Sequence, residues 1–308
     1  MSKKVLISIG KNCYNQNKES KINNKSKKVK DIKKDKGRKM NDKKNNPLVE
    51  DPSSVVSNLT ALCRNTMQAV TWLSTNICAK LDQAELYEEK QLVEKQIQNC
   101  YKLLRGAKNV EDMCFYQTEM QSEQVFCVDK ILESICKNVQ QLLTHTQRKF
   151  EFNIEEKDVK INADLRRFEN AFLNVLSNAF SYSPAEAKVS VLLSVINNNA
   201  VIKVSDNGYG MSSEVLSQAV VAGFTTEREN AKQGLGLYLA DAFAKRTNGN
   251  LIINSKENEG TTVTISLPLT EKESQSLEAD EIEYYSKLYS PIDVALSDCL
   301  EIKLLKFM

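Results

Sequence analysis

The chain has 308 residues, 41% of them hydrophobic and 27% charged, which is typical of one or two globular units with a sizeable core. No apolar run approaches the roughly 18 residues of a membrane-spanning helix. The opening KKVLISIG has too short an apolar stretch, and no small-residue cleavage site, for a signal peptide. These features argue against the membrane-spanning and secreted classes, and we expect a cytoplasmic protein.

Charge is divided unevenly along the chain. Residues 1–46 hold 16 Lys or Arg and four Asp or Glu, a net charge of +12, so the rest of a chain whose total is +2 carries −10. Because this segment is also rich in Lys, Asn and Ser and poor in aromatic residues, we expect residues 1–50 to be a disordered basic arm. A solvated tail is the plainer interpretation, and contact with nucleic acid or anionic lipid is the alternative.

The eight cysteines form no CxxC pair, and most lie among apolar residues in helix-like segments. We interpret them as reduced core thiols rather than as metal ligands or a disulfide framework. They are Cys13, Cys63, Cys78, Cys100, Cys114, Cys127, Cys136 and Cys299.

A helical hairpin is predicted for residues 53–118. Apolar residues recur there at spacings of three and four, which indicates two long helices without an internal proline. Asp82 and Glu85 are spaced like a capping box between them. Because so narrow a seam cannot bury the whole apolar surface of one hairpin, we expect it to pair with a second copy into a four-helix homodimer.

Residues 120–269 show a mixed pattern of helices and strands. The predicted order is the strand QVFCV, a helix from Asp129, the strand KFEFNI, a helix from Asp164, the hairpin of AKVSVLLSVI with AVIKVSD, the helix GLGLYLADAFAKRT, and the hairpin of LIINS with TTVTISL. This order predicts an α+β fold, with helices on one face of a mixed or antiparallel sheet. Residues 270–308 read as an acidic C-terminal extension, whose end is apolar enough to dock against another surface.

Two asparagines stand in the middle of the helix FENAFLNVLSNAFSYSP, where asparagine is a poor helix former. At about 100° per residue the apolar side chains gather on one face, and Asn174 and Asn178 fall together roughly on the other. Their carboxamides therefore face either water or a bound ligand.

The strand AVIKVSD ends in DNGYGM, where Asp206 shares the core-facing side of the strand. A carboxylate there needs a donor, and an adenine amine is one candidate. Gly208 and Gly210 permit positive φ and the approach of a flat group. An ordinary Asp-Asn-Gly hairpin turn is the alternative.

The segment QGLGLY places Gly234 and Gly236 at the start of a helix, where free amides and the helix dipole favour phosphate. A simple helix entry is the alternative. The preceding GFTTERENAK is polar and suits a loop that closes over phosphates, with Thr225, Thr226, Arg228 or Lys232 near the charge. A merely solvated loop is equally compatible with it.

Taken in order, these segments resemble the ATP-binding domain of the histidine kinase, Hsp90, gyrase and MutL superfamily, most closely that of two-component sensor kinases. DLRRFENAFLNVLSNAFSYSP resembles the N box, DNGYGM the first glycine box, GFTT the F box, QGLGLYLA the second glycine box and EGTTVTISLPL the closing strand. The resemblance covers residues 120–269 and implies a Bergerat-type α/β sandwich that binds ATP and Mg²⁺.

The resemblance also implies roles for individual residues. Asn178 would supply a carboxamide oxygen to Mg²⁺, and Asp206 would bind adenine. The remaining nucleotide contacts that the resemblance implies are Gly208, Gly210, Thr225, Thr226, Gly234, Leu235, Gly236, Leu237 and Thr262.

Asn174 stands where the hydrolysing members of the superfamily have a glutamate that deprotonates water. A neutral imidazole needs no such base near pH 7, so this position favours transfer to histidine over an ATP-hydrolysing machine. The resemblance thus implies a histidine-kinase-like phosphotransferase, with a response regulator or another phosphoacceptor protein as its partner.

The hairpin departs from that pattern. In ALCRNTMQAV the register of Arg64 and Asn65 puts Ala61 where sensor kinases carry the phosphorylated histidine. The single histidine, His145, lies within the ATP-binding region, and we interpret it as an exposed or helix-terminal residue rather than an acceptor. The alternative function is a catalytically inactive, nucleotide-gated binding module, a pseudokinase or an anti-sigma-like switch.

Overall fold

The computed structural model describes residues 52–116, 123–144, 146–224, 234–272, 290–297 and 299. Among its described helices, none combines the length and the apolar character needed to cross a bilayer. The seven cysteines in this part of the chain are free thiols. Cys100, Cys127 and Cys136 are buried, whereas Cys63 is exposed and is not the core thiol that was expected.

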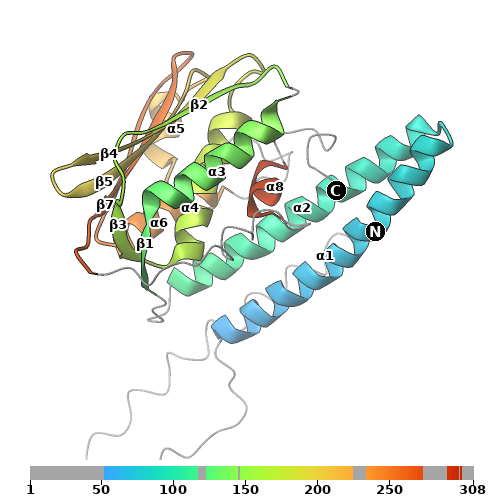
Figure 1. The fold of residues 1–308 in the computed structure, drawn as a ribbon, viewed down its shortest axis with the longest axis horizontal. Coiled ribbons are helices and arrows are strands. Elements are labelled where there is room, and N and C mark those ends of the chain that lie inside the picture. Colours follow the sequence, from blue (N-terminus) through green and yellow to red (C-terminus); the bar gives the residue numbers. More distant parts are fainter. Residues whose placement is uncertain are drawn as a thin grey trace, which may run out of the picture. The chain divides into compact units, whose positions relative to one another are not determined.

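The predicted hairpin consists of α1 (Pro52–Gln83) and α2 (Tyr87–Tyr116), which run side by side (Figure 1). The turn between them is a Schellman motif: Leu86 N donates to Leu81 O at 2.9 Å, and Glu85 N donates to Asp82 O at 3.1 Å. Glu85 takes the left-handed position with φ of 58°. The expected capping box was therefore wrong, because Asp82 belongs to the last turn of α1.

The hairpin buries few of its large apolar side chains. Its own buried cluster consists of Ile97, Tyr101 and Leu104 on α2, against which Met67, Cys78 and Val93 pack. Many other large side chains of the hairpin are exposed, which agrees with the narrow seam expected from the sequence. They are Leu59, Leu62, Val70, Trp72, Leu73, Ile77, Leu86, Tyr87, Leu92, Leu103 and Val110.

The rest of the described chain is an α+β domain built on a five-stranded mixed sheet. The strands lie in the order β2-β4-β5-β7-β6, where β2 pairs parallel with β4 and the other pairs are antiparallel. The strands are β2 (Lys149–Ile154), β4 (Lys188–Ile196), β5 (Asn199–Asp206), β6 (Asn250–Lys256) and β7 (Gly260–Pro268). Both predicted hairpins are present.

Two elements of this domain, β3 (Lys160–Ala163) and the short helix α5 (Ser213–Gln218), were not predicted. The predicted strand QVFCV is β1 (Gln124–Cys127), and it pairs with β3 in a separate two-stranded sheet. Because β3 has four residues and α5 has six, neither shows a hydrophobic period that sequence analysis can detect.

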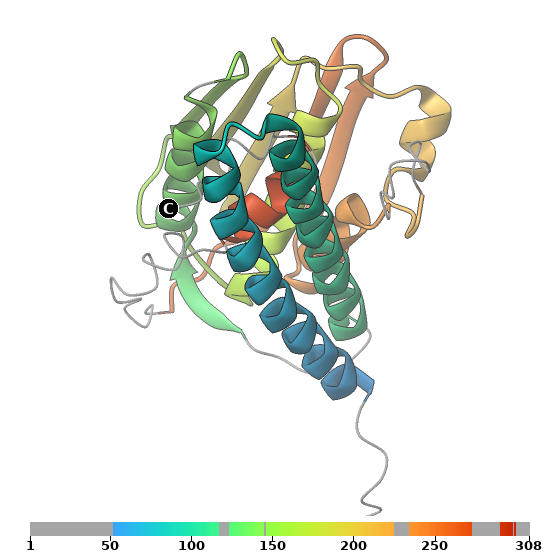
Figure 2. The same cartoon turned by 90° about the vertical axis from the view of Figure 1, so that its right-hand side faces the viewer.

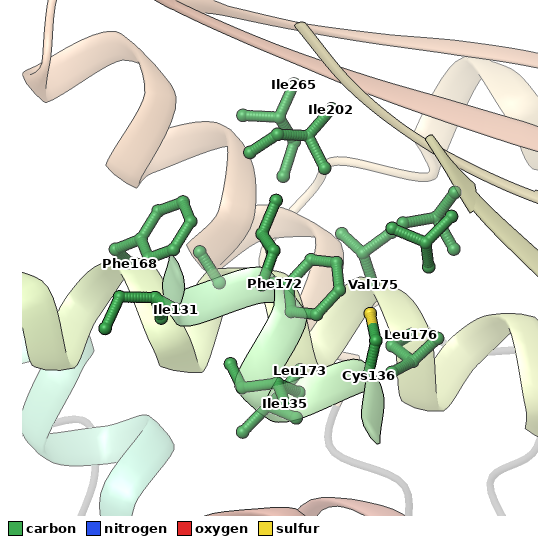
Figure 3. Packing of buried hydrophobic residues seen from close by; sticks show 14 of the residues in the cluster. Ile131, Ile135, Cys136, Phe168, Phe172, Leu173, Val175, Leu176, Ile202 and Ile265 are labelled. Carbon is green, nitrogen blue, oxygen red and sulfur yellow. The ribbon is translucent and has the colours of Figure 1, made fainter. Parts of the chain in front are cut away.

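Three helices cover one face of the sheet, as Figures 1 and 2 show: α3 (Val128–Leu143), α4 (Leu165–Ser181) and α6 (Gly236–Arg246). Asp164 begins α4 as its N-cap by accepting from Arg167 N at 3.0 Å. Phe172 and Val175 of α4 pack toward Ile202 and Ile265 of the sheet in Figure 3.

The helix α4 is buried on almost every side, unlike the amphipathic helix expected from its apolar stripe. Its polar residues Glu169, Asn170, Asn174 and Ser177 are buried along with its phenylalanines. The other helices account for this, because α4 is packed against α6 and α8 (Pro291–Leu296) as well as the sheet.

Candidate nucleotide-binding site

A cleft, whose space of about 310 Å³ includes open solvent, lies where the C-terminal half of α4 meets the end of β5, the start of β7 and the start of α6. It is lined by Val175, Asn178, Ala179, Tyr182, Val204, Asp206, Met211, Leu237, Thr261 and Val263. Three predicted site residues, Asn178, Asp206 and Leu237, are thus brought together.

Asp206 is held in place by the backbone around it. Gly208 N donates to its Oδ1 at 2.9 Å and Thr261 N donates to the same atom at 3.3 Å. Burial raises the pKa of Asp206, and hydrogen bonds from Gly208, Thr261 and Ser183 offset part of that rise because they favour the ionised form. The site therefore presents an oriented, partly desolvated carboxylate to the cleft.

The packing of the backbone requires glycine at positions 208 and 210, independently of any ligand. A Cβ on Gly208 would lie 2.3 Å from Tyr182 O, and a Cβ on Gly210, where φ is 62°, would lie 1.9 Å from Lys256 O. Tyr209 N between them donates to Tyr182 O at 3.0 Å. The two glycines therefore let the end of β5 pack closely against α4 and against the β6–β7 hairpin, and so fix the position of Asp206.

The two asparagines of α4 have different surroundings. Asn178 lines the cleft, whereas Asn174 is 2% exposed and lies under the start of α6. A Cβ on Gly236 would lie 3.5 Å from Asn174 Cβ, and among the described residues the buried Nδ2 of Asn174 has no hydrogen-bond partner. A buried N–H donor of this kind is costly unless an acceptor reaches it.

The start of α6 is built from the predicted glycines. Gly234 has φ of 64°, and its carbonyl accepts from Gly223 N at 3.1 Å. Leu235 occupies the N-cap position and makes no side-chain cap, so the first amides of α6 lack that partner. An eleven-residue helix with an uncapped N-terminus suits an anion.

Some predicted residues lie elsewhere. The structure places Thr262 on the opposite face of β7 from the cleft, where its hydroxyl is 2.9 Å from Ser205 Oγ. Thr261 is the residue of this strand that lines the cleft, because it pairs with Asp206 in the register. Thr225, Thr226, Arg228, Lys232 and His145 lie outside the described residues.

Sequence reasoning missed four residues here: Tyr182, Ser183, Met211 and Thr261. Tyr182 and Ser183 follow Asn178 by one turn of the helix, and Met211 ends the DNGYGM motif, so their position beside named residues was an available signal. Thr261 also had a signal in the sequence, because it shares the core-facing side of its strand with Val263, Ile265 and Leu267, whereas Thr262 points to the other face.

The fold and the cleft together define a Bergerat-type α/β sandwich, as predicted. Residues 163–271 match the family described as "Histidine kinase-, DNA gyrase B-, and HSP90-like ATPase". This part of the chain is therefore a histidine kinase-like ATPase domain, and the resemblance inferred from the five motifs is confirmed.

Curated relatives of the chain are named as sensor kinases. The heme sensor protein HssS of Staphylococcus saprophyticus is 31% identical over 135 residues, which cover 41% of this chain and 29% of the relative. Histidine kinase P4 of Formosa agariphila is 22% identical over 231 residues, which cover 70% of this chain and 17% of the relative. The matched part is thus less than a third of either relative's own length.

A solved structure shows a similar fold. The full-length ShkA crystal structure in complex with AMPPNP has a TM-score of 0.55 at 15% identity and covers 74% of this chain and 48% of that chain. This coverage exceeds the ATPase domain alone.

Proposed function

We propose that the chain binds Mg-ATP in this cleft and is a histidine-kinase-like phosphotransferase of the two-component type. The observation that carries the proposal is that Asp206 and Asn178 line one cleft that extends to Leu237, in the first turn of α6. The ionised Asp206 would accept a hydrogen bond from the exocyclic amine of adenine. The amides at the start of α6 would bind the phosphates.

Magnesium fits the same site. Among the described residues, no cluster of three His, Cys, Asp or Glu side chains is present that would hold a metal by itself. Mg²⁺ is commonly bound by one or two protein oxygens together with phosphates and water, and Asn178 offers a neutral oxygen in the cleft. The ion would neutralise charge on the phosphates. The unpaired Asn174 amide beside Gly236 offers a buried donor to the same region.

The proposed acceptor is a histidine on a partner protein. Asn174 has no basic group to deprotonate a water or serine nucleophile, whereas a neutral imidazole needs none. The position expected for an acceptor on α1 is Ala61, which is exposed on the hairpin. A response regulator is the expected recipient of the phosphoryl group in a two-component pair.

We also propose that the hairpin forms a homodimer. Its exposed apolar side chains, which include Trp72 at 56% and Leu92 at 67% exposure, would be covered by a second copy. The proposal places the ATPase domain in the cytoplasm, the compartment that supplies ATP.

A second candidate function is a nucleotide-gated binding module without phosphoryl transfer. The specific observation that favours it is the alanine at position 61. Because the hairpin then lacks the histidine that would accept a phosphoryl group, the ATPase domain could act through nucleotide binding alone. In this function ATP binding alone would change the surface presented to a regulator.

Calorimetry and labelling separate these functions. Asn178→Ala is expected to abolish Mg-dependent ATP binding, with Asn153→Ala on the exposed side of β2 as the control. ATP carrying a labelled γ-phosphate is then incubated with the protein and a candidate partner. Acid-labile label on a partner histidine supports the phosphotransferase, and tight binding without label supports the module. No nucleotide heat in the folded wild type would refute both.

A further inference from the structure

The C-terminal extension contributes a described helix that the proposed function does not use. This helix, α8, begins at the N-cap Ser290, whose hydroxyl accepts from Ile292 N at 3.1 Å, and Pro291 occupies its first turn. Although it has only six residues, most of its side chains are buried. A helix of six residues is not stable alone, so its contacts with the rest of the chain are what hold it in place.

One side of α8 belongs to the core of the ATPase domain. Ile292 and Leu296 are fully buried, Ala295 is 7% exposed, and all three join the apolar cluster that contains α3 and α4. Their spacing of three and four puts them on one face of the helix.

Another side of α8 belongs to the hairpin. Val294 packs against the separate cluster of Ile97, Tyr101 and Leu104 on α2. At the end of the helix, Gln98 Nε2 on α2 donates to Ser297 O at 3.0 Å. Figure 2 shows α8 in red behind the hairpin, and Figure 1 shows it between α4 and α2.

The helix therefore contributes side chains to both apolar clusters of the described chain. We propose that α8 is an intramolecular latch that fastens the ATPase domain to the hairpin alongside the direct contacts between α2 and α4, so that the two move apart only after α8 has left its place between them. Within the proposed function, on which this part rests, the latch holds the phosphoryl donor away from an acceptor on another chain.

Hydrogen exchange on the 308-residue chain tests the latch without nucleotide. Val294→Asp places a charge against the hairpin cluster while Ile292 and Leu296 keep their contacts in the ATPase domain. We expect exchange of the α2 amides near Ile97–Leu104 to rise about tenfold or more, while β4 and β5 keep their wild-type protection. Ile252→Asp is the control, because this side chain is 49% exposed on β6 and makes the same change of charge elsewhere.

Two exchange results would overturn the latch. Unchanged α2 exchange in Val294→Asp would show that α8 does not hold the hairpin. Equal loss of protection in α2, β4 and β5 would show that α8 is only a part of the domain core.

A third readout addresses regulation. Transfer of the labelled phosphoryl group to a partner histidine is expected to be faster in Val294→Asp than in the wild type, and an equal rate would overturn the regulatory part of the proposal. ATP calorimetry on both proteins reports separately on the proposed function, since Val294 does not line the cleft.

Discussion

Asp112 on α2 and Arg167 on α4 form an ion pair whose Oδ1 and Nε atoms are 2.9 Å apart, with the aspartate side chain only 1% exposed. Asn170 on α4 donates a hydrogen bond to the other oxygen of Asp112. The Arg167 guanidinium also lies over the ring of Phe115, 4.3 Å from its centroid. Together these contacts form a polar joint between the hairpin and the ATPase domain, separate from the apolar contact made by α8.

Removal of the cation from this joint should destabilise the protein strongly. In Arg167→Met the Asp112 carboxylate stays buried and loses the larger of the two cationic contributions, from Arg167 and Lys108, that lower its pKa, so we expect the free energy of unfolding to fall by about 3 kcal/mol. Arg166→Met is the matched control, because Arg166 is exposed on the same turn and should cost less than about 0.5 kcal/mol. Urea unfolding of both variants measures the difference, and equal midpoints would contradict the importance of the pair.

The same joint should make stability depend on pH. Burial raises the pKa of Asp112 from its ordinary 3.8 to about 6, although Arg167, Lys108 and the hydrogen bond from Asn170 each oppose the rise and Glu111 adds to it. The folded state thus binds the proton more tightly than the unfolded state. The contribution of Asp112 to the free energy of unfolding is therefore greatest below about pH 4 and is lost as the pH rises from about 4 to 6. Linkage puts the loss at roughly 3 kcal/mol.

Asp112→Asn isolates this effect from other carboxylates. A neutral amide cannot titrate, so the wild-type minus variant stability should change with pH between about 4 and 6 and be flat above. We also expect the variant to be as stable as wild type, or more so, at pH 7. A pH profile that is parallel for the two proteins would show that Asp112 titrates normally.

The hairpin turn offers a stabilising substitution. Glu85 occupies the left-handed position of the Schellman motif, which favours glycine. Glu85→Gly should raise the free energy of unfolding by about 0.5–1 kcal/mol, because relief of the strained φ exceeds the entropy gained by the unfolded chain. Gln83→Gly, two residues earlier and still within α1, should instead lower the free energy of unfolding by a similar amount. Thermal unfolding that shifts the same way in both variants would refute this account.

The parts of the fold that sequence analysis could predict are those with a strong local period. The 3.6-residue stripe indicated α1, α2, α3 and α4, and alternation indicated both β hairpins, because these patterns record which side of an element is buried. Neither the parallel pairing of β2 with β4 nor the burial of Asn174 has a local signal. Both follow from how distant elements pack together.

The same limit applies to the site. Asp206 and Asn178 could be singled out from the sequence because each is unfavourable where it stands. Asp206 is a carboxylate on the core-facing side of a strand, and Asn178 is a poor helix former in the middle of a helix. Thr262 was named instead of Thr261 although the alternation of Val263, Ile265 and Leu267 puts Thr261 on the core-facing side of the strand, so this error was avoidable. The helix α8 was foreseen only as an apolar end that would dock, since six residues define no period.

The first glycine box gives a test of backbone packing. Gly210→Ala combines a left-handed φ of 62° with a Cβ that would lie 1.9 Å from Lys256 O, so we expect a loss of about 3 kcal/mol of stability. Gly223→Ala shares the left-handed conformation at φ 79° but meets no atom within 4 Å, so it should cost only about 1 kcal/mol. Similar losses in the two variants would mean that φ strain alone, and not the collision with the β6–β7 hairpin, makes Gly210 necessary.

The role of Asp206 can be tested from both sides of the proposed contact. If its carboxylate accepts from the adenine amine, wild-type protein should bind ATP more tightly than inosine triphosphate, in which a carbonyl replaces that amine. Asp206→Asn should weaken ATP binding roughly 10- to 100-fold, because a hydrogen bond to a charged group is lost, while affinity for inosine triphosphate should change less. Since burial raises the pKa of Asp206, wild-type ATP affinity should also fall as pH decreases through that pKa, and the variant should lack this dependence. Equal loss of both nucleotides in Asp206→Asn, with folding intact by circular dichroism, would assign Asp206 to the structure of the β5 end and not to base recognition.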